Sequence, residues 1–277
     1  MLNQHSRTLA MVLLLLVWAS FADRMLYAAP FNDKQLEAAV RDVLREPTAA
    51  LTDDKLKNVY VLEADGKHIR DLTGLEKCKN LAQLKVSRND LSDLKPLKDL
   101  VNLQSLDLAD NKISDLTPLA GLTKLQYLEL SHNQISKVEA LKSLTSLSSL
   151  YLSHNKITDV GELGGLTRLS SLYLGHNQIK DISVLNKVTR LMTLELKDNQ
   201  IENLAPLGKQ TDLNLLLLEN NKIADLTPLV NWAKADAEGP RRCAPFLRLY
   251  LKGNPLSDQA KTKQLEALKK FGVRIEN

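Results

Sequence analysis

The feature that most constrains this 277-residue chain is an asparagine that recurs every 22 residues without insertion or deletion. An apolar residue stands two positions after each asparagine, leucine in the first case and isoleucine in the others. A fixed period of this length is typical of solenoids, in which each repeat is one supersecondary unit. The seven asparagines in strict register are Asn89, Asn111, Asn133, Asn155, Asn177, Asn199 and Asn221.

Seven apolar positions repeat in register with the asparagine, at offsets −8, −5, −3, +2, +5, +8 and +11 from it. The register extends back to a first repeat that begins at Val59 and has Lys67 in place of asparagine, so eight repeats provide 56 such positions. Among them only Gln210 is polar, although the whole chain is just 44% hydrophobic. One repeat cannot bury seven apolar side chains by itself, so the repeats must stack.

The spacing within a repeat predicts its local structure. Apolar residues at offsets −5 and −3 enclose an outward position, which is the alternation of a strand. The sequence from Asp115 to Leu119 then predicts a turn and a short helical segment, because Asp favours a cap and Pro118 suits a first helical turn. Stacked repeats therefore place their strands in a parallel sheet. We expect the recurring asparagines, with Asn254 in a ninth repeat, to form a structural ladder that satisfies backbone groups after each strand.

Residues 103–122, LQSLDLADNKISDLTPLAGL, closely resemble the 22-residue leucine-rich repeat of bacterial internalins. The resemblance implies an α/β fold, namely a right-handed leucine-rich repeat solenoid. Its curved parallel sheet would line the concave face and short 3-10 or helical segments the convex face. A helical cap would precede the repeats and a helix-strand cap would follow them. The resemblance also implies protein recognition.

The expected domain organisation follows the repeats. Leu9–Ala22 is an uncharged run that would span about 21 Å as a helix, short of the ~30 Å hydrocarbon core, so it indicates a cleaved signal peptide and export. An uncleaved membrane tether is the alternative. After processing we expect no membrane span. The predicted segments are a signal peptide at 1–22 (alternative end near 29), an N-terminal cap at 30–58, nine repeats at 59–256 with an insertion at 235–245, and a C-terminal cap at 257–277.

The ninth repeat and the insertion carry two further expectations. Phe246, Leu249 and Leu251 restore the apolar pattern, so we expect all three in the core. The insertion is predicted to be an exposed loop. Cys78 and Cys243 lie too many strand spacings apart to form a disulfide, since their Cα atoms would need to be within about 7 Å. We expect Cys78 to be buried and Cys243 to be a free thiol or a link between chains.

Composition and motifs exclude several functions. The net charge is only +4 and both signs are mixed, so no nucleic-acid partner is expected. Phosphate-binding loops, nucleophile elbows and zinc-protease motifs are missing from the sequence, so we expect no enzyme and no cofactor. His132, His154 and His176 stand one residue before consecutive asparagines and should form a column. A straight column does not converge as a zinc site requires, so no metal is expected.

The predicted concave face gathers half of the six tyrosines in the middle repeats, beside carboxylates. Tyrosine is enriched at protein interfaces, although strands also favour it on exposed faces. We therefore expect a monomer that binds a protein or peptide on this face. A receptor for cell-envelope glycans is one alternative, and an intracellular regulatory scaffold is another if the N-terminal segment does not direct export. The candidate contact residues are Asp107, Tyr127, Glu129, Tyr151, Tyr173, Glu195, His132, His154 and His176.

A second apolar run lies nearer the C-terminus, at Met192, Leu215 and Leu217. The sequence allows two interpretations of it. The run either extends the same concave surface or is covered by the insertion.

Overall fold

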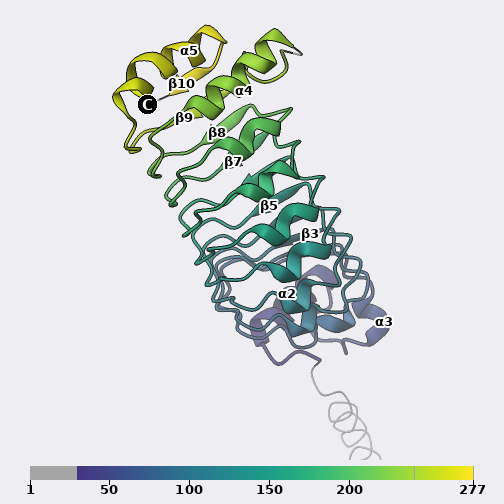
Figure 1. The fold of residues 1–277 in the computed structure, drawn as a ribbon. Coiled ribbons are helices and arrows are strands. Elements are labelled where there is room, and N and C mark those ends of the chain that lie inside the picture. The colour runs from purple at the N-terminus through teal and green to yellow at the C-terminus, as the bar shows by residue number, and fades with distance from the viewer. Residues whose placement is uncertain (1–29, 240, 277) are drawn as a thin grey trace, which may run out of the picture.

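The computed structural model describes residues 30–239 and 241–276. They form one open sheet of ten parallel strands that follow one another in chain order (Figure 1). The parallel-sheet solenoid that the 22-residue period predicted is therefore confirmed. The strands are β1 Val61–Glu63, β2 Gln83–Lys85, β3 Ser105–Asp107, β4 Tyr127–Glu129, β5 Ser149–Tyr151, β6 Ser171–Tyr173, β7 Thr193–Glu195, β8 Leu215–Leu217, β9 Arg248–Tyr250 and β10 Arg274–Glu276.

Short helical segments return the chain from one strand to the next. Most are 3-10 turns that begin shortly after an Asp or Asn whose side chain accepts a hydrogen bond from a backbone N–H two residues later, as Asp115 does from Thr117 (2.8 Å). The helical segments are α2 Lys34–Leu44, α3 Asp53–Leu56, η1 Leu75–Lys77, η2 Lys95–Leu97, η3 Thr117–Leu119, η4 Glu139–Ser143, η5 Gly161–Gly165, η6 Ser183–Asn186, η7 Ala205–Lys209, α4 Thr227–Glu238, η8 Ala260–Gln264 and α5 Leu265–Lys270.

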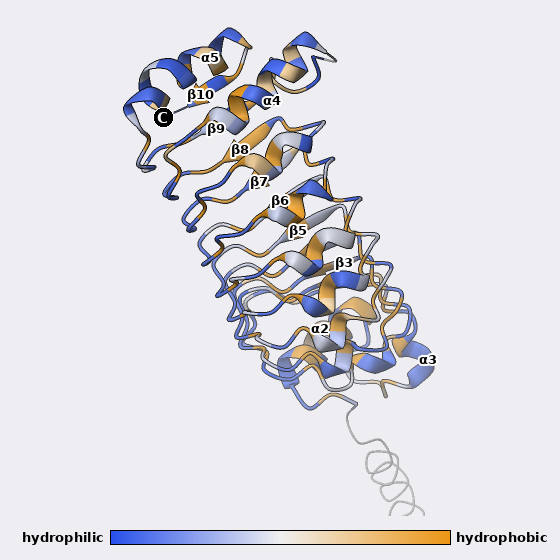
Figure 2. Ribbon diagram, viewed as in Figure 1, coloured by the Kyte–Doolittle hydropathy of each residue, from blue (hydrophilic) through white to orange (hydrophobic). Residues whose placement is uncertain are grey.

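One continuous core runs the length of the solenoid. All 56 positions of the seven-residue apolar pattern are buried, including the polar Gln210. The hydropathy colouring shows the same apolar stretches recurring in each repeat (Figure 2). Gln210 is tolerated there because its amide donates to the carbonyls of Leu185 (3.0 Å) and Val188 (2.9 Å). Hydrophobic burial between neighbouring repeats therefore holds the stack together.

The recurring asparagines join each repeat to the one before it. Asn155 Oδ1 accepts from the backbone N–H of Ile135, while its Nδ2 donates to the carbonyls of Leu130 and Leu152, each at 3.0 Å. The amide thus satisfies buried backbone groups of two repeats at once. Equivalent bonds are made by Asn89, Asn111, Asn133, Asn177, Asn199, Asn221 and Asn254.

Helices lie at both ends of the described sheet. At the N-terminal end, α2 buries Leu36, Ala39 and Val40, and Asp33 caps it by accepting from the N–H groups of Gln35 and Leu36. At the C-terminal end, α5 leads into β10, which pairs in parallel with β9. This tenth strand belongs to no 22-residue repeat, but with α5 it forms the helix-strand cap that the resemblance implied. The predicted signal peptide lies outside the described residues.

The sequence predicted that the insertion is an exposed loop, but the structure shows that part of it is helical and packed. Helix α4 continues through residue 238, and Asp236 on it is buried and accepts from the backbone N–H groups of Arg242, Cys243 and Ala244 at 2.8–3.0 Å. Those bonds fold the end of the insertion back onto the helix. No helix among residues 30–239 and 241–276 is both long enough and apolar enough to cross a bilayer.

The prediction that Phe246 enters the core is wrong, because Phe246 is 61% exposed and Leu247 is fully buried. The backbone N–H groups of both residues point to the carbonyl of Cys243 (2.9 Å each). The resulting turn places the side chain of Leu247, one position later, in the core. The first core position of the ninth repeat is thus shifted by one residue from the repeat register.

Both cysteines are buried and free. Burial raises the pKa of Cys78 to about 12 and that of Cys243 to about 11. Cys243 is only 1% exposed, so the expectation that it links two chains is not supported by this conformation. Its thiol instead fills part of the core beneath the insertion.

Candidate functional site

The sheet presents the first and third residues of its three-residue strands on one face. In β2–β6 and β8 the middle residue is buried and its two neighbours are half-buried. The strands pair without a shift in register, so that Glu129 lies opposite Tyr151 and Tyr151 opposite Tyr173. Side chains at one strand position therefore form columns across the repeats, about 4.8 Å apart.

The three middle-repeat tyrosines form one aromatic surface. The ring centroids of Tyr151 and Tyr173 are 4.6 Å apart with the rings 19° from parallel, and those of Tyr127 and Tyr151 are 5.4 Å apart at 46°. Tyr127 starts its strand whereas Tyr151 ends the next one, so these two meet diagonally. Each tyrosine is half-buried, which leaves ring edges and hydroxyls available to a partner. We call Tyr127, Tyr151 and Tyr173 the tyrosine cluster.

Two carboxylates continue the column on its N-terminal side. Asp107 lies opposite Glu129, and Glu129 lies opposite Tyr151. The side chains are held in place because Asp107 accepts from the N–H of Ala109 (3.1 Å) and Glu129 from that of Ser131 (2.7 Å). Burial raises the pKa of both carboxyls, and it raises the pKa of Tyr127 to about 12 with a further contribution from Glu129. The Tyr127 hydroxyl is therefore a donor at neutral pH.

Glu195 was expected on the same exposed face, but the structure buries it to 4% exposure. Its Oε2 accepts from Ser153 Oγ (2.7 Å) and from the N–H of Gly175 (3.2 Å), and its Oε1 lies 3.2 Å from Lys197 Nζ. The side chain folds back over Gly175, where a Cβ would come within 2.4 Å of Oε1. Glu195 thus joins three repeats and is not presented to a partner. The sequence feature that could have predicted the burial of Glu195 is Gly175, because the other repeats have a residue with a side chain at that offset.

The three histidines also form a column. Their rings stack in parallel, with centroids 4.0 Å apart for His132 and His154 and 3.9 Å apart for His154 and His176. An acid lies at each end, since His132 Nδ1 is 3.9 Å from Asp110 and His176 Nε2 is 3.3 Å from Asp198. Within the described residues, no group of three or more His, Cys, Asp or Glu side chains is arranged to hold a metal ion.

Backbone geometry explains why histidine suits this column. His132, His154 and His176 all adopt left-handed φ values of 54–57°. Asn, Asp and His are the non-glycine residues most enriched in that region. The residue before the asparagine is left-handed in the other repeats of the register as well, where it is Arg88, Asp110, Asp198 or Asn220. The histidines are therefore compatible with a backbone requirement of the turn, and their stacking adds an exposed edge beside the tyrosine cluster.

The middle histidine should make stability depend on pH. Burial, followed by the charges of His132 and His176, lowers the pKa of His154. The native state then binds fewer protons than the unfolded state, so the free energy of unfolding should fall as pH drops from about 7.5 to about 5. His154→Asn should lessen this fall, because asparagine occupies the equivalent left-handed position at Asn220 without a titrating group.

Thermal unfolding of both proteins across that pH range tests the prediction. Wild type should lose more of its melting temperature on acidification than the variant loses. Identical pH profiles for the two proteins would contradict the assignment of this protonation to His154.

The second apolar run stays accessible. Met192 is 49% exposed, and Leu215 and Leu217 are half-buried on the sheet face, with Leu217 opposite Glu195. Helix α4 packs on η7, on the other side of the repeat, where Trp232 donates to the carbonyl of Gln210 (2.9 Å). The run therefore extends the accessible sheet face toward the C-terminus and is not covered by α4.

Comparison with known proteins places the repeats in a family. The family model for leucine rich repeats (two copies) matches residues 101–143 and 145–187. Internalin C2 from Listeria monocytogenes is 34% identical in sequence, with a TM-score of 0.71, and the match covers 73% of this chain and 91% of that one. No curated protein matches the chain.

More distant structures share the fold. The functional domain of InlJ from Listeria monocytogenes is 24% identical over 87% of this chain and 54% of its own, with a TM-score of 0.60. The ectodomain of the plant receptor kinase GASSHO1/SCHENGEN3 from Arabidopsis thaliana is 24% identical over 82% of this chain and 28% of its own, with a TM-score of 0.62. The structure of that ectodomain was solved in complex with Casparian strip integrity factor 2.

Proposed function

Because the chain belongs to the internalin-like leucine-rich repeat proteins, we propose that it is a non-catalytic module that binds a protein or peptide on the concave face of its sheet. The observation that carries the proposal is the tyrosine cluster, in which Tyr151 and Tyr173 stack and Tyr127 packs at a tilt across β4–β6 in the middle of the face. Rigid tyrosines offer large contact area at a low cost in side-chain entropy.

The surroundings of the cluster favour a partner with polar and cationic groups. Asp107 and Glu129 lie in the same column as Tyr151, and the histidine column follows the ends of the same strands. Tyrosine hydroxyls can donate while the carboxylates accept, so backbone amides and basic side chains of a partner would both find complements. The accessible run at Met192, Leu215 and Leu217 provides an apolar continuation toward the C-terminus.

Export completes the proposal. The uncharged run Leu9–Ala22 is the basis for proposing that the protein is exported. Mass spectrometry of the protein isolated from its own cells tests this. An N-terminus near residue 23 or 30 in an envelope or secreted fraction supports a cleaved signal. An intact Met1 in the cytoplasmic fraction would instead favour an intracellular scaffold. We expect the module to act as a monomer.

Affinity capture from extracts and envelope fractions tests the binding face. A variant carrying Tyr127→Ala, Tyr151→Ala and Tyr173→Ala should bind the partner at least about 100-fold more weakly than wild type, since interface tyrosines each contribute on the order of 1–2 kcal/mol. Tyr60→Ala is the matched control, because Tyr60 is 55% exposed but lies outside the cluster. Each variant must keep the wild-type melting temperature.

The outcomes separate the candidate functions. A protein retained by wild type and Tyr60→Ala but lost by the triple variant supports the proposal. Equal capture by all three would place the site elsewhere. A glycan lost in the same pattern would make the module a polysaccharide receptor, since tyrosine faces flanked by acids also suit sugars.

A further inference from the structure

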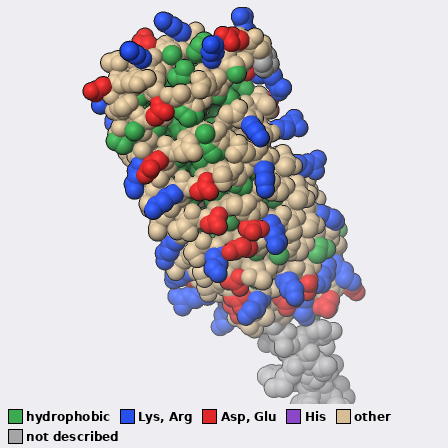
Figure 3. All heavy atoms as spheres, in the orientation of Figure 1, with side chains coloured by type: hydrophobic (Ala, Val, Ile, Leu, Met, Phe, Trp, Pro, Cys, Tyr) green, Lys and Arg blue, Asp and Glu red, His purple; other side chains and the backbone are tan. Residues whose placement is uncertain are grey.

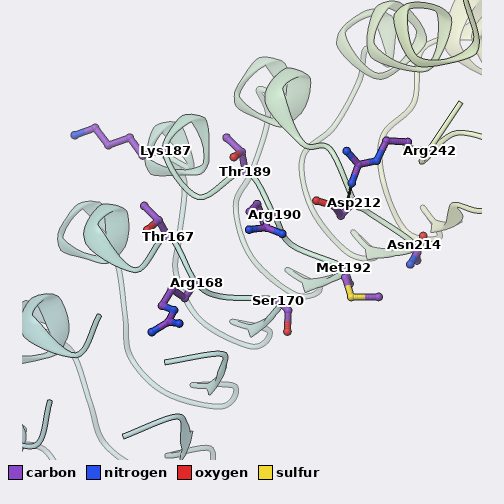
Figure 4. A pocket seen from close by; sticks show the side chains of 10 residues that line it. All are labelled: Thr167, Arg168, Ser170, Lys187, Thr189, Arg190, Met192, Asp212, Asn214 and Arg242. Carbon is purple, nitrogen blue, oxygen red and sulfur yellow. Dashed lines mark hydrogen bonds and ion pairs between the residues drawn. The ribbon is translucent and has the colours of Figure 1, made fainter. Parts of the chain in front are cut away.

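A second candidate site is a hollow of about 690 Å³ beside the starts of β6, β7 and β8, apart from the tyrosine cluster (Figure 4). Three successive repeats build it from equivalent positions. Thr167 and Thr189 occupy the same repeat offset, and Arg168 and Arg190 occupy the next one. The repeats are joined there by backbone hydrogen bonds, because the N–H of Met192 donates to the carbonyl of Ser170 (2.8 Å) and that of Asn214 to the carbonyl of Met192 (2.9 Å). The lining therefore repeats at the ~4.8 Å spacing of the strands.

The hollow is cationic. Arg168, Lys187 and Arg190 line it, are exposed, and take part in no ion pair recorded among residues 30–239 and 241–276. A fourth cation, Arg242, is paired with Asp212, the one carboxylate of the lining. Lys and Arg side chains also follow the right-hand edge of the face in Figure 3. The Lys187 ammonium points away from the other lining side chains in Figure 4, so Arg168 and Arg190 are the two uncompensated cations that attract an anionic ligand.

The rest of the lining distinguishes among anions. The exposed Met192 side chain adds an apolar contact, and the hydroxyls of Thr167, Thr189 and Ser170 with the amide of Asn214 add hydrogen-bonding groups. A polyanionic sugar would offer no apolar group to pack against the exposed Met192 side chain. A peptide can present carboxylates, backbone amides and an apolar side chain together.

We propose that this hollow binds an acidic peptide segment. Two carboxylates at alternate peptide positions would pair with Arg168 and Arg190, and an apolar side chain of the peptide would pack on Met192. In an extended peptide, alternate side chains lie on one side about 6.7 Å apart, which two arginines on neighbouring repeats can reach. Arginine pairs with carboxylates in a bidentate geometry, so both contacts are charge-assisted. The hollow shares Met192 with the apolar run but no residue with the tyrosine cluster, so it does not require the tyrosine cluster to bind a partner.

Fluorescence anisotropy with a defined probe tests the site on the protein as its cells produce it. The probe is a labelled seven-residue peptide with two glutamates at alternate positions followed by leucine, and its matched control has glutamine for both glutamates. The protein variants are Arg168→Glu with Arg190→Glu, and the milder Arg168→Gln with Arg190→Gln. Lys124→Glu is the control, because Lys124 has the same repeat offset outside the hollow, where it donates to Asn102.

We expect charge reversal to weaken binding of the glutamate probe at least tenfold and the glutamine pair of substitutions to weaken it less. Lys124→Glu and Tyr151→Ala should bind within about twofold of wild type, and raising the salt should weaken wild-type binding through screening. If the two Arg→Glu substitutions unfold the protein, the binding affinity of the Arg168→Gln, Arg190→Gln variant tests the proposal instead.

Three results would overturn the proposal. One is unchanged binding after loss of both arginine charges, and another is equal binding of the glutamine peptide. The third is arginine-dependent binding of a sulfated polysaccharide with no binding of the glutamate probe, which would assign the hollow to a sugar.

Discussion

Asn155→Ala should lower the free energy of unfolding by about 3 kcal/mol, because it leaves buried backbone groups of two repeats without partners. The wild-type amide accepts from the N–H of Ile135 and donates to the carbonyls of Leu130 and Leu152, each at 3.0 Å. Asn155 is only 9% exposed, so water cannot replace these bonds without opening the turn.

Denaturant unfolding and amide hydrogen exchange measure this effect. The Ile135 N–H should exchange much faster in the variant than in wild type. Asn102→Ala is the matched control, since its side chain donates at the surface to the carbonyl of Lys79 and should cost no more than about 0.5 kcal/mol. Equal losses at both sites would show that the ladder contributes no more than a surface amide.

Asp236→Ala should cost a comparable amount, about 3 kcal/mol, and its effect should be local. The carboxylate accepts from three backbone N–H groups, those of Arg242, Cys243 and Ala244, and it is 8% exposed. Charge-assisted bonds of this kind are stronger than neutral ones, and their loss strands three donors. The end of the insertion should then detach from α4.

Thiol labelling reads out that detachment. Cys243 is 1% exposed and burial raises its pKa to about 11, so it should react slowly with a thiol reagent in the wild type. In a Cys78→Ala background, Asp236→Ala should speed its labelling at least tenfold. Glu238→Ala, on the same helix but exposed, should leave both the rate and the stability unchanged. No change in the labelling rate of Cys243 would show that other contacts hold the insertion.

Most of the fold could be predicted because one residue period fixes both burial and pairing. Each apolar offset of the repeat corresponds to a buried position, so the core from Val59 to Trp232 follows from counting. The period fails where the chain leaves it. At Phe246 a local turn shifts the core position by one residue, and β10 pairs through a segment with no repeat of its own.

The candidate site was less predictable because exposure depends on neighbours. The offsets placed the tyrosines in adjacent strands, and their stacking follows from that placement. Glu195 has the same offset as Tyr151, yet it folds inward because Gly175 leaves room beside it. The cationic hollow had a signal in the sequence, since Arg168 and Arg190 share one offset in consecutive repeats. Its far side, however, comes from Arg242, which the insertion brings back.

The uniform 22-residue spacing also makes the molecule adjustable in length. Any block from one asparagine to the next carries the same set of buried positions and the same strand, so its removal would join two compatible neighbours. Such a deletion shortens the solenoid by one increment of about 4.8 Å. Removed from between Asn89 and Asn111, such a block would leave the tyrosine cluster intact and bring it one increment nearer to α2. Gene duplication or loss could therefore tune the reach of this protein in discrete steps while each surface keeps its own chemistry.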